Sequence, residues 1–202
     1  MVKTAVQKRD EAPAPHVEVL LTSKGPQYPP GRMLVASPLE VQEVVMRIPP
    51  KRVLRLGDLR ATLATKYRAD YTCAMTTGLF LRIVAEAACA ERGKKGPAIP
   101  YWRVVRDDGE LIDKLPGGTA AAAAQLEADE VAIFHLGQRV VVANVEHYAW
   151  VPPPPRQRTA AGDVAPATPR VASPTGAGKP GAQGAQGGRG ARPQRDKRRG
   201  PG

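Results

Sequence analysis

Hydrophobic positions follow a helical period in the segment that begins near residue 38. Between residues 38 and 47, apolar side chains at positions 39, 41, 44, 45 and 46 gather mainly on one helix face. Ser37 is a suitable N-cap for this segment, and Pro38 is favoured at the first helical position. Two prolines at positions 49 and 50 end the pattern. We therefore expect a helix over residues 38–47.

Two further helical segments follow, with a turn between them. The first covers residues 59–66, with Asp58 as a candidate N-cap. The second covers residues 75–91, where apolar residues at 79, 80, 83, 84, 87 and 88 form one continuous face. Residues 67–74 connect the two. Helix-turn-helix proteins use such a pair to place the second helix in a DNA groove, although many other helical domains contain one.

The chain after residue 98 contains short β-branched segments. Residues 99–105 are a candidate extended segment, and the Arg-Asp-Asp-Gly sequence at 106–109 predicts a turn after it. Thr119 is a candidate N-cap for an alanine-rich helix that extends to residue 129. The β-branched residues on either side of Gly137 predict a terminal hairpin, whose second strand is a wing or a sheet edge.

The large apolar residues are concentrated between residues 33 and 151, which predicts one folded domain. We place this domain at residues 38–151. Residues 1–37 form a partly disordered N-terminal arm, and residues 152–202 form a disordered basic tail rich in Pro, Gly, Ala and Arg. The fold class is mainly α with a small β component: a winged helix-turn-helix domain between two tails.

The formal net charge of +11 is distributed unevenly along the chain. Residues 38–151 hold 15 basic and 14 acidic side chains, whereas residues 152–202 hold 10 basic and 2 acidic ones. The folded part is therefore almost neutral. A strong electrostatic attraction to phosphate is expected mainly from the tail.

Several classes of protein are excluded by the remaining composition. Cys73 and Cys89 lie in apolar helical sequence, which favours free thiols in a reducing cytoplasm. The chain lacks an apolar run of the roughly 18 to 20 residues that cross a bilayer, and residues 1–15 do not resemble a signal peptide. The three histidines have no ligand spacing. We expect a cytoplasmic, nucleoid-associated monomer without a metal, a cofactor or a membrane partner.

Three motifs occur in the order and spacing of a known family. Val45-Met-Arg-Ile-Pro-Pro-Lys-Arg-Val-Leu-Arg-Leu-Gly-Asp-Leu59 is followed by Ile99-Pro-Tyr-Trp-Arg-Val-Val-Arg-Asp-Asp-Gly109 and then by Pro116-Gly-Gly118. Together they resemble the DNA-binding domain of methylated-DNA protein-cysteine methyltransferases, whose active-site segment reads Ile-Pro-Cys-His-Arg-Val-Val. The resemblance implies a winged helix-turn-helix that enters the minor groove, flips an alkylated guanine and transfers its alkyl group to a cysteine.

The residues that perform this transfer in the family are replaced here. Tyr101 occupies the position of the cysteine and Trp102 that of the histidine, while Glu130 matches the family's carboxylate. Without a thiolate and its base the transfer has no nucleophile. The chain is therefore not expected to be an enzyme. It resembles a divergent branch of the alkyltransferase-like proteins, in which a tryptophan replaces the cysteine and the lesion is bound without repair.

The resemblance also selects the residues that would contact DNA. Met75-Thr-Thr-Gly78 lies where the family's recognition helix begins Arg-Ala-Val-Gly, and Met75 is suited to act as an apolar wedge. Thr76 and Thr77 contact phosphate or cap the helix. Arg82 is a further candidate for groove or phosphate contact. Lys94 and Lys95 form the clearest basic pair in the domain, and the alternative is that they are simply solvated.

A lesion pocket is expected around the altered active-site segment. Tyr101 and Trp102 either line a base-sized aromatic pocket or fill the space left by the lost active site. Arg103, which we include in this group with Glu130, is expected to brace the loop. Cys73, which precedes a helix, is either a relocated nucleophile or, as we favour, a structural thiol.

The function predicted from these observations is non-catalytic binding of double-stranded DNA that is alkylated or distorted, in DNA repair and together with other repair proteins. Two alternatives remain. One is an architectural nucleic-acid-binding protein that acts through its basic tail. The other is an alkyltransferase that uses Cys73.

Overall fold

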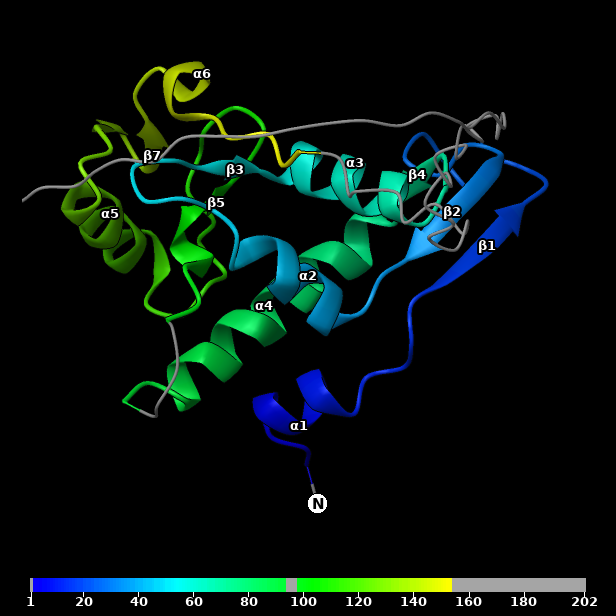
Figure 1. Ribbon diagram of the computed structural model, residues 1–202. Coiled ribbons are helices and arrows are strands. Elements are labelled where there is room, and N and C mark those ends of the chain that lie inside the picture. Colours follow the sequence, from blue (N-terminus) through cyan, green and yellow to red (C-terminus); the bar gives the residue numbers. More distant parts are fainter. Residues whose placement is uncertain (1, 94–97, 154–202) are drawn as a thin grey trace, which may run out of the picture. The chain divides into compact units, whose positions relative to one another are not determined.

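The computed structural model describes residues 2–93 and 98–153, which contain helices and small sheets (Figure 1). The helices are α1 (Ala5–Asp10), α2 (Pro38–Val45), α3 (Leu56–Lys66), α4 (Ala74–Ala90), α5 (Gly118–Ala128) and α6 (Val145–Tyr148), with a 3₁₀ turn at Tyr101–Arg103. The strands are β1 (His16–Leu20), β2 (Gly31–Val35), β3 (Leu54–Arg55), β4 (Tyr71–Thr72), β5 (Val104–Val105), β6 (Ile133–Leu136) and β7 (Arg139–Val142).

Helix α4 supplies the centre of the main core. It packs against α2 and α1, and Figure 1 shows it passing behind α2. Its inward face carries Leu81 and Val84, which are buried together with Val41 of α2 and with Leu59 and Leu63 of α3. Burying branched side chains of this kind stabilises a fold by roughly 1.5 to 3 kcal/mol each. The predicted buried face of α4 is confirmed at Val84 but is wrong at Leu79, which is exposed, while Leu81, outside the predicted set, is buried.

The boundaries predicted for α2 and α4 agree with the structure within two residues. Ser37 is the N-cap of α2 as predicted, since its hydroxyl accepts a hydrogen bond from the backbone N–H of Glu40 at 3.4 Å. Met46 is the C-cap of α2, so the helix ends just before the two prolines at positions 49 and 50, as predicted.

Helix α3 begins three residues earlier than predicted. Its N-cap is Arg55, and Asp58, the predicted cap, lies inside the first turn and accepts a hydrogen bond from Arg55 Nε at 2.7 Å. The carboxylate of Asp107 binds the start of this helix, accepting from the backbone N–H of Gly57 at 2.5 Å. The parallel pairing of β3 with β5 brings Asp107 to this point from 50 residues away.

The start of α5 also differs from the prediction. Gly117, with φ of +80°, is the N-cap instead of Thr119. A Cβ at position 117 would lie 2.5 Å from the Cβ of Ala121, so this turn requires glycine for both its conformation and its space. Beyond α5, strands β6 and β7 pair antiparallel, which confirms the predicted terminal hairpin.

The largest difference concerns residues 1–37, which we expected to be a partly disordered arm. Strand β2 pairs antiparallel with β1 and parallel with β4, so this arm is part of the folded unit. Arg9 of α1 is buried and donates two hydrogen bonds to the carboxylate of Glu91, at 2.6 and 3.1 Å. The partners outside the arm are 38 or more residues away in sequence, and local apolar density therefore underestimated the order of this segment.

The helix pair α3 and α4, joined through β4, occupies the segment predicted as a helix-turn-helix, and β6–β7 the predicted wing. That assignment stays a prediction. None of the helices within residues 2–93 and 98–153 is long and apolar enough to cross a membrane. In the same part of the chain, His, Cys, Asp and Glu side chains do not gather into a group of three or more that would hold a metal ion. Lys94, Lys95 and the predicted disordered tail from residue 154 onward lie outside the described residues.

Candidate nucleic-acid interface

The first half of α4 exposes an apolar surface. Met75 and Leu79 are 73% and 54% exposed, and Gly78 and Arg82 lie on the same side of the helix. We call these four residues the α4 face. Exposed single apolar residues are common, but two neighbouring ones at the start of a helix form a small surface that favours contact with another apolar surface.

Gly78 adds a notch to the α4 face. It lies within a helix of 17 residues, where glycine costs roughly 1 kcal/mol relative to alanine. A Cβ at this position would find no atom within 4 Å among the described residues, so intramolecular packing there does not require glycine. Its missing side chain leaves the helix backbone open to close approach by a partner.

Two threonines beside the α4 face have different roles. The hydroxyl of Thr77 is buried and donates to the backbone carbonyl of Cys73 at 2.7 Å. Thr77 therefore faces the interior, which favours a role at the helix start over the phosphate contact, the two alternatives left open for it. Thr76 is half-buried, and its hydroxyl bonds the same carbonyl at 3.3 Å. Both hydroxyls thus hydrogen-bond a backbone carbonyl at the start of α4, and the phosphate contact of Thr76 stays a prediction.

Arg82 is exposed and paired. Its Nε donates to Glu86 Oε1 at 2.7 Å, one helical turn further along. An exposed pair of this type contributes roughly 0.3 to 0.5 kcal/mol, so a phosphate is able to compete for the guanidinium. The position of Arg82 at the end of the α4 face agrees with the predicted phosphate contact without testing it.

Tyr101, which the sequence motif aligns with a cysteine, belongs to the main core. It is 7% exposed, and its hydroxyl lies 3.2 Å from the Sγ of Cys89. Burial, together with the hydrogen bond to Cys89, raises the pKa of Tyr101 to about 12, which keeps the phenol neutral. Of the two alternatives for this ring, the packing favours the filling of space over an open aromatic pocket.

Trp102 is half-buried and held by a carboxylate. Its indole N–H donates to Asp129 Oδ2 at 3.1 Å, and its ring contacts Tyr101 edge to face with 5.5 Å between centroids. The guanidinium of Arg103 lies 5.7 Å from the indole centroid, within the range of a cation–π contact. Of the two rings, Trp102 is therefore the one with surface left to meet a partner.

Arg103 braces this segment, as predicted. Its Nε and Nη2 bind the two carboxylate oxygens of Asp129 at 2.6 and 2.8 Å, and its Nη1 donates to the carbonyl of Ile48 at 3.1 Å. The paired side chains are only 12% and 17% exposed. The hydrogen bonds from Arg103 and Trp102 lower the pKa of Asp129 despite its burial. One side chain thus ties the 3₁₀ turn to the end of α5 and to the segment after α2.

Glu130 was the carboxylate selected from the sequence, but its neighbour Asp129 is the one that contacts Trp102 and Arg103. Its side chain is 71% exposed and pairs with Lys51 at 2.7 Å. Asp129 is the C-cap of α5 and points toward Trp102, whereas Glu130 has a φ of +60° and turns outward. Two adjacent acidic residues at a helix end look equivalent in the sequence. The backbone conformation at the end of α5 decides which of the two side chains faces Trp102.

Cys73 is the N-cap residue of α4 and is 4% exposed. Burial raises its pKa, but hydrogen bonds from Thr76 and Tyr28 and from the backbone of Thr76 and Met75 outweigh this, so that its pKa is lowered. A stabilised thiolate would favour nucleophilic chemistry. Its burial nevertheless blocks approach by an alkyl group on DNA, which favours the structural role.

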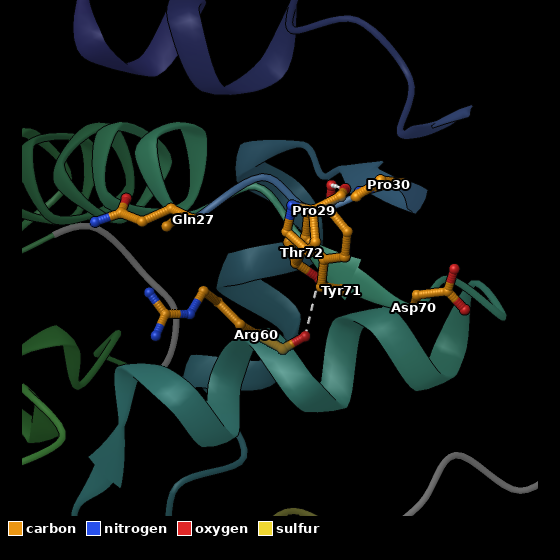
Figure 2. Close-up of a pocket in the computed structure, with 8 residues that line it drawn as sticks. Gln27, Pro29, Pro30, Arg60, Asp70, Tyr71 and Thr72 are labelled. Atoms are coloured by element: carbon orange, nitrogen blue, oxygen red, sulfur yellow. Dashed lines mark hydrogen bonds between the residues drawn. The ribbon is translucent and has the colours of Figure 1, made fainter. Parts of the chain in front are cut away.

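A cavity of about 610 Å³ lies beside the start of α4 (Figure 2). Its lining comes from the loop before β2, from α3, from β4 and from the first residue of α4: Gln27, Pro29, Pro30, Arg60, Asp70, Tyr71, Thr72 and Ala74. This site was not predicted from the sequence, because three of its residues belong to the arm that we expected to be partly disordered. The adjacent prolines at 29 and 30 are the nearest signal of a fixed loop.

No protein-family model matches the chain, and no curated protein matches it. Solved structures do match. A crystal structure of S. pombe Atl1 in complex with damaged DNA containing O6-carboxymethylguanine has a TM-score of 0.41 and 20% identity, and covers 57% of this chain and 94% of its own. A crystal structure of S. pombe ATL in complex with DNA has a TM-score of 0.41 and 18% identity over the same shares of both chains.

Proposed function

We propose that this chain is a non-catalytic, alkyltransferase-like DNA-binding protein that places the α4 face in the minor groove of alkylated or distorted duplexes. The observation that carries the proposal is the exposure of Met75 and Leu79 around the open backbone of Gly78. This surface lies at the helix start that the sequence motifs align with a recognition helix. Minor-groove proteins insert such apolar wedges between base steps, and damaged or mismatched steps resist this least.

The absence of catalysis follows from what occupies the reactive positions. Tyr101 is a buried, neutral phenol in the place of the cysteine, and Trp102 cannot accept a proton as the family's histidine does. Cys73, the other thiol considered, is buried beneath the start of α4. We therefore propose recognition of the lesion without transfer, in which Trp102 and the braced segment around Arg103 provide the selectivity.

A second candidate function is sequence-independent nucleic-acid binding by the tail, because residues 152–202 carry 10 basic and 2 acidic side chains. Such a tail would bind any nucleic acid through counterion release, with affinity that falls steeply with salt. In that case the α4 face would contribute nothing to affinity, and intact and damaged duplexes would bind equally.

The experiment compares full-length wild type with Met75→Ala and Leu79→Ala. Binding to matched duplexes with and without one O6-alkylguanine is measured by fluorescence anisotropy at physiological salt. Met46→Ala and Leu39→Ala, exposed residues of the same types on or next to α2, are the controls. We expect at least tenfold tighter binding to the damaged duplex, equal to about 1.4 kcal/mol. That preference falls in the two α4 variants and persists in the controls. Equal affinity for both duplexes in wild type would overturn the proposal and favour the tail.

A further inference from the structure

The cavity beside α4 opens next to the surface that we propose for DNA. Ala74, which lines it, is the first residue of α4 and directly precedes the exposed Met75. The loop before β2 also lines the cavity, with Gln27, Pro29 and Pro30. A DNA strand that follows the α4 face toward its N-terminus would therefore meet this cavity.

The polar groups in the cavity are divided between two ends. Figure 2 shows the side chains of Gln27 and Arg60 on one side, and Asp70 on the other. The carboxylate of Asp70 already accepts the backbone N–H of Arg32 at 2.7 Å. The guanidinium of Arg60 is partly exposed and meets Asp107 at 3.3 Å, a long and exposed ion pair that a phosphate is able to replace. One end thus offers a cation and an amide, both donors for phosphate oxygens.

The surrounding segments carry an excess of positive charge. Residues 21–32 and 67–74 contribute Lys24, Arg32 and Arg68 against Asp70, and Arg60 with its partner Asp107 leaves this balance unchanged. The middle of the cavity is less polar, because Tyr71 and the two prolines form its walls. A volume of about 610 Å³ is within the usual range of ligand pockets and exceeds what a single ion needs. A nucleotide combines an anionic phosphate with a base whose flat faces stack on apolar and aromatic side chains, and it fits a lining of this kind.

The loop that closes the cavity is held in place by the rest of the fold. The hydroxyl of Tyr71 donates to the carbonyl of Pro29 at 2.6 Å. Backbone hydrogen bonds from Lys24 to Tyr28 and from Tyr28 to Gly25, both at 3.0 Å, close the turn before it. The cavity is therefore formed before a ligand arrives, which lowers the entropy cost of binding.

We propose that this cavity binds one nucleotide of the DNA strand that leaves the α4 face, with its phosphate at Arg60 and Gln27. The N-terminal arm then extends the DNA contact beyond the helix pair α3 and α4. This inference rests on the proposed function, and it assigns a binding role to residues that the sequence motifs do not include.

The test uses the full-length protein and the alkylated duplex, with Arg60→Gln, Gln27→Ala and Gln27→Glu as variants. Arg106→Gln is the matched control, because Arg106 is an exposed, ion-paired arginine outside the cavity. Affinity is measured over a salt series, and hydroxyl-radical footprinting reports which nucleotides are protected. We expect Arg60→Gln to weaken binding about tenfold and to reduce the salt slope by about one unit, since one phosphate contact is lost. Gln27→Glu should weaken binding more than Gln27→Ala, and the protected region should shorten at one end.

The outcomes separate the cavity from the proposed function. If wild type binds and Met75→Ala weakens binding, but the three cavity variants retain the affinity, salt slope and footprint of Arg106→Gln, the cavity proposal is wrong and the α4 proposal stands. If wild type does not bind DNA, both are wrong. Gln27 is exposed and outside the core, so its variants test the site even if Arg60→Gln unfolds.

Discussion

Removal of the Asp129 carboxylate should destabilise the fold far more than removal of its neighbour, Glu130. Asp129 accepts two hydrogen bonds from Arg103 and one from the indole of Trp102, in a region where the charged side chains are 12% and 17% exposed. Asp129→Ala would leave the guanidinium of Arg103 buried with the carbonyl of Ile48 as its remaining hydrogen-bond partner in this group.

The expected magnitude follows from this geometry. Breaking a buried ion pair by removing one partner costs about 3 to 5 kcal/mol, and the residual exposure of this pair places the estimate for Asp129→Ala at the lower end, about 3 kcal/mol. Glu130→Ala removes a pair whose carboxylate is 71% exposed, and should cost less than about 0.5 kcal/mol. For a folded unit of this size, about 3 kcal/mol lowers Tm by roughly 6 to 12 °C.

Urea titrations followed by circular dichroism would measure both variants, with Arg103→Ala and the double variant Arg103→Ala/Asp129→Ala completing a cycle. We expect the cost of the double variant to be smaller than the sum of the single costs by about 1 to 3 kcal/mol. The reasoning is refuted if Asp129→Ala costs less than Glu130→Ala, or if the two single costs add.

The same carboxylate predicts a pH dependence of stability. The pKa of Asp129 is lowered in the folded state, chiefly by its hydrogen bonds with Arg103, so its stabilisation is fully present above the unfolded pKa of about 3.9. It is lost as the pH falls through the folded pKa. The difference in unfolding free energy between wild type and Asp129→Asn should be constant from pH 7 to about 5 and should shrink below about pH 4. A difference that persists at low pH would contradict this.

Three further predictions concern other parts of the chain. Gly117→Ala should lower the unfolding free energy by at least about 1 kcal/mol, because it combines a positive φ with a Cβ only 2.5 Å from that of Ala121; an unchanged urea midpoint would count against this. Cys73 should react with a thiol reagent such as DTNB only on unfolding, and should show no mass increase after incubation with alkylated DNA; prompt alkylation of native protein would instead support an enzyme. Truncation after residue 158 should reduce the salt slope of DNA binding while the preference for the damaged duplex persists, and loss of that preference would assign it to the tail.

Parts of the candidate site could be predicted from the sequence because they depend on local signals. The period of α4 correctly placed Val84 and Ala87 in the core, but it also placed Leu79 on the buried face, whereas Leu79 is exposed and Leu81, outside the predicted set, is buried. The bracing role of Arg103 was expected from its place in the motif. For Thr77 the sequence left a phosphate contact and a role at the helix start both open, and its buried hydroxyl, bonded to the carbonyl of Cys73, favours the second.

The sequence by itself determined the extents of α2 and α4 to within two residues, the N-cap at Ser37 and the hairpin β6–β7, since propensity and spacing within a few residues decide such features. Tertiary structure alone decided the rest. The pairing of β2 with β4 places the N-terminal arm beside the rest of the fold and brings the cavity-lining residues together. Asp107, 50 residues away in sequence, binds the backbone N–H of Gly57 at the start of α3. The backbone at the end of α5 directs Asp129, and not Glu130, toward Arg103 and Trp102. Each of these outcomes depends on a partner that is distant in sequence, whose position is determined only when the core has assembled.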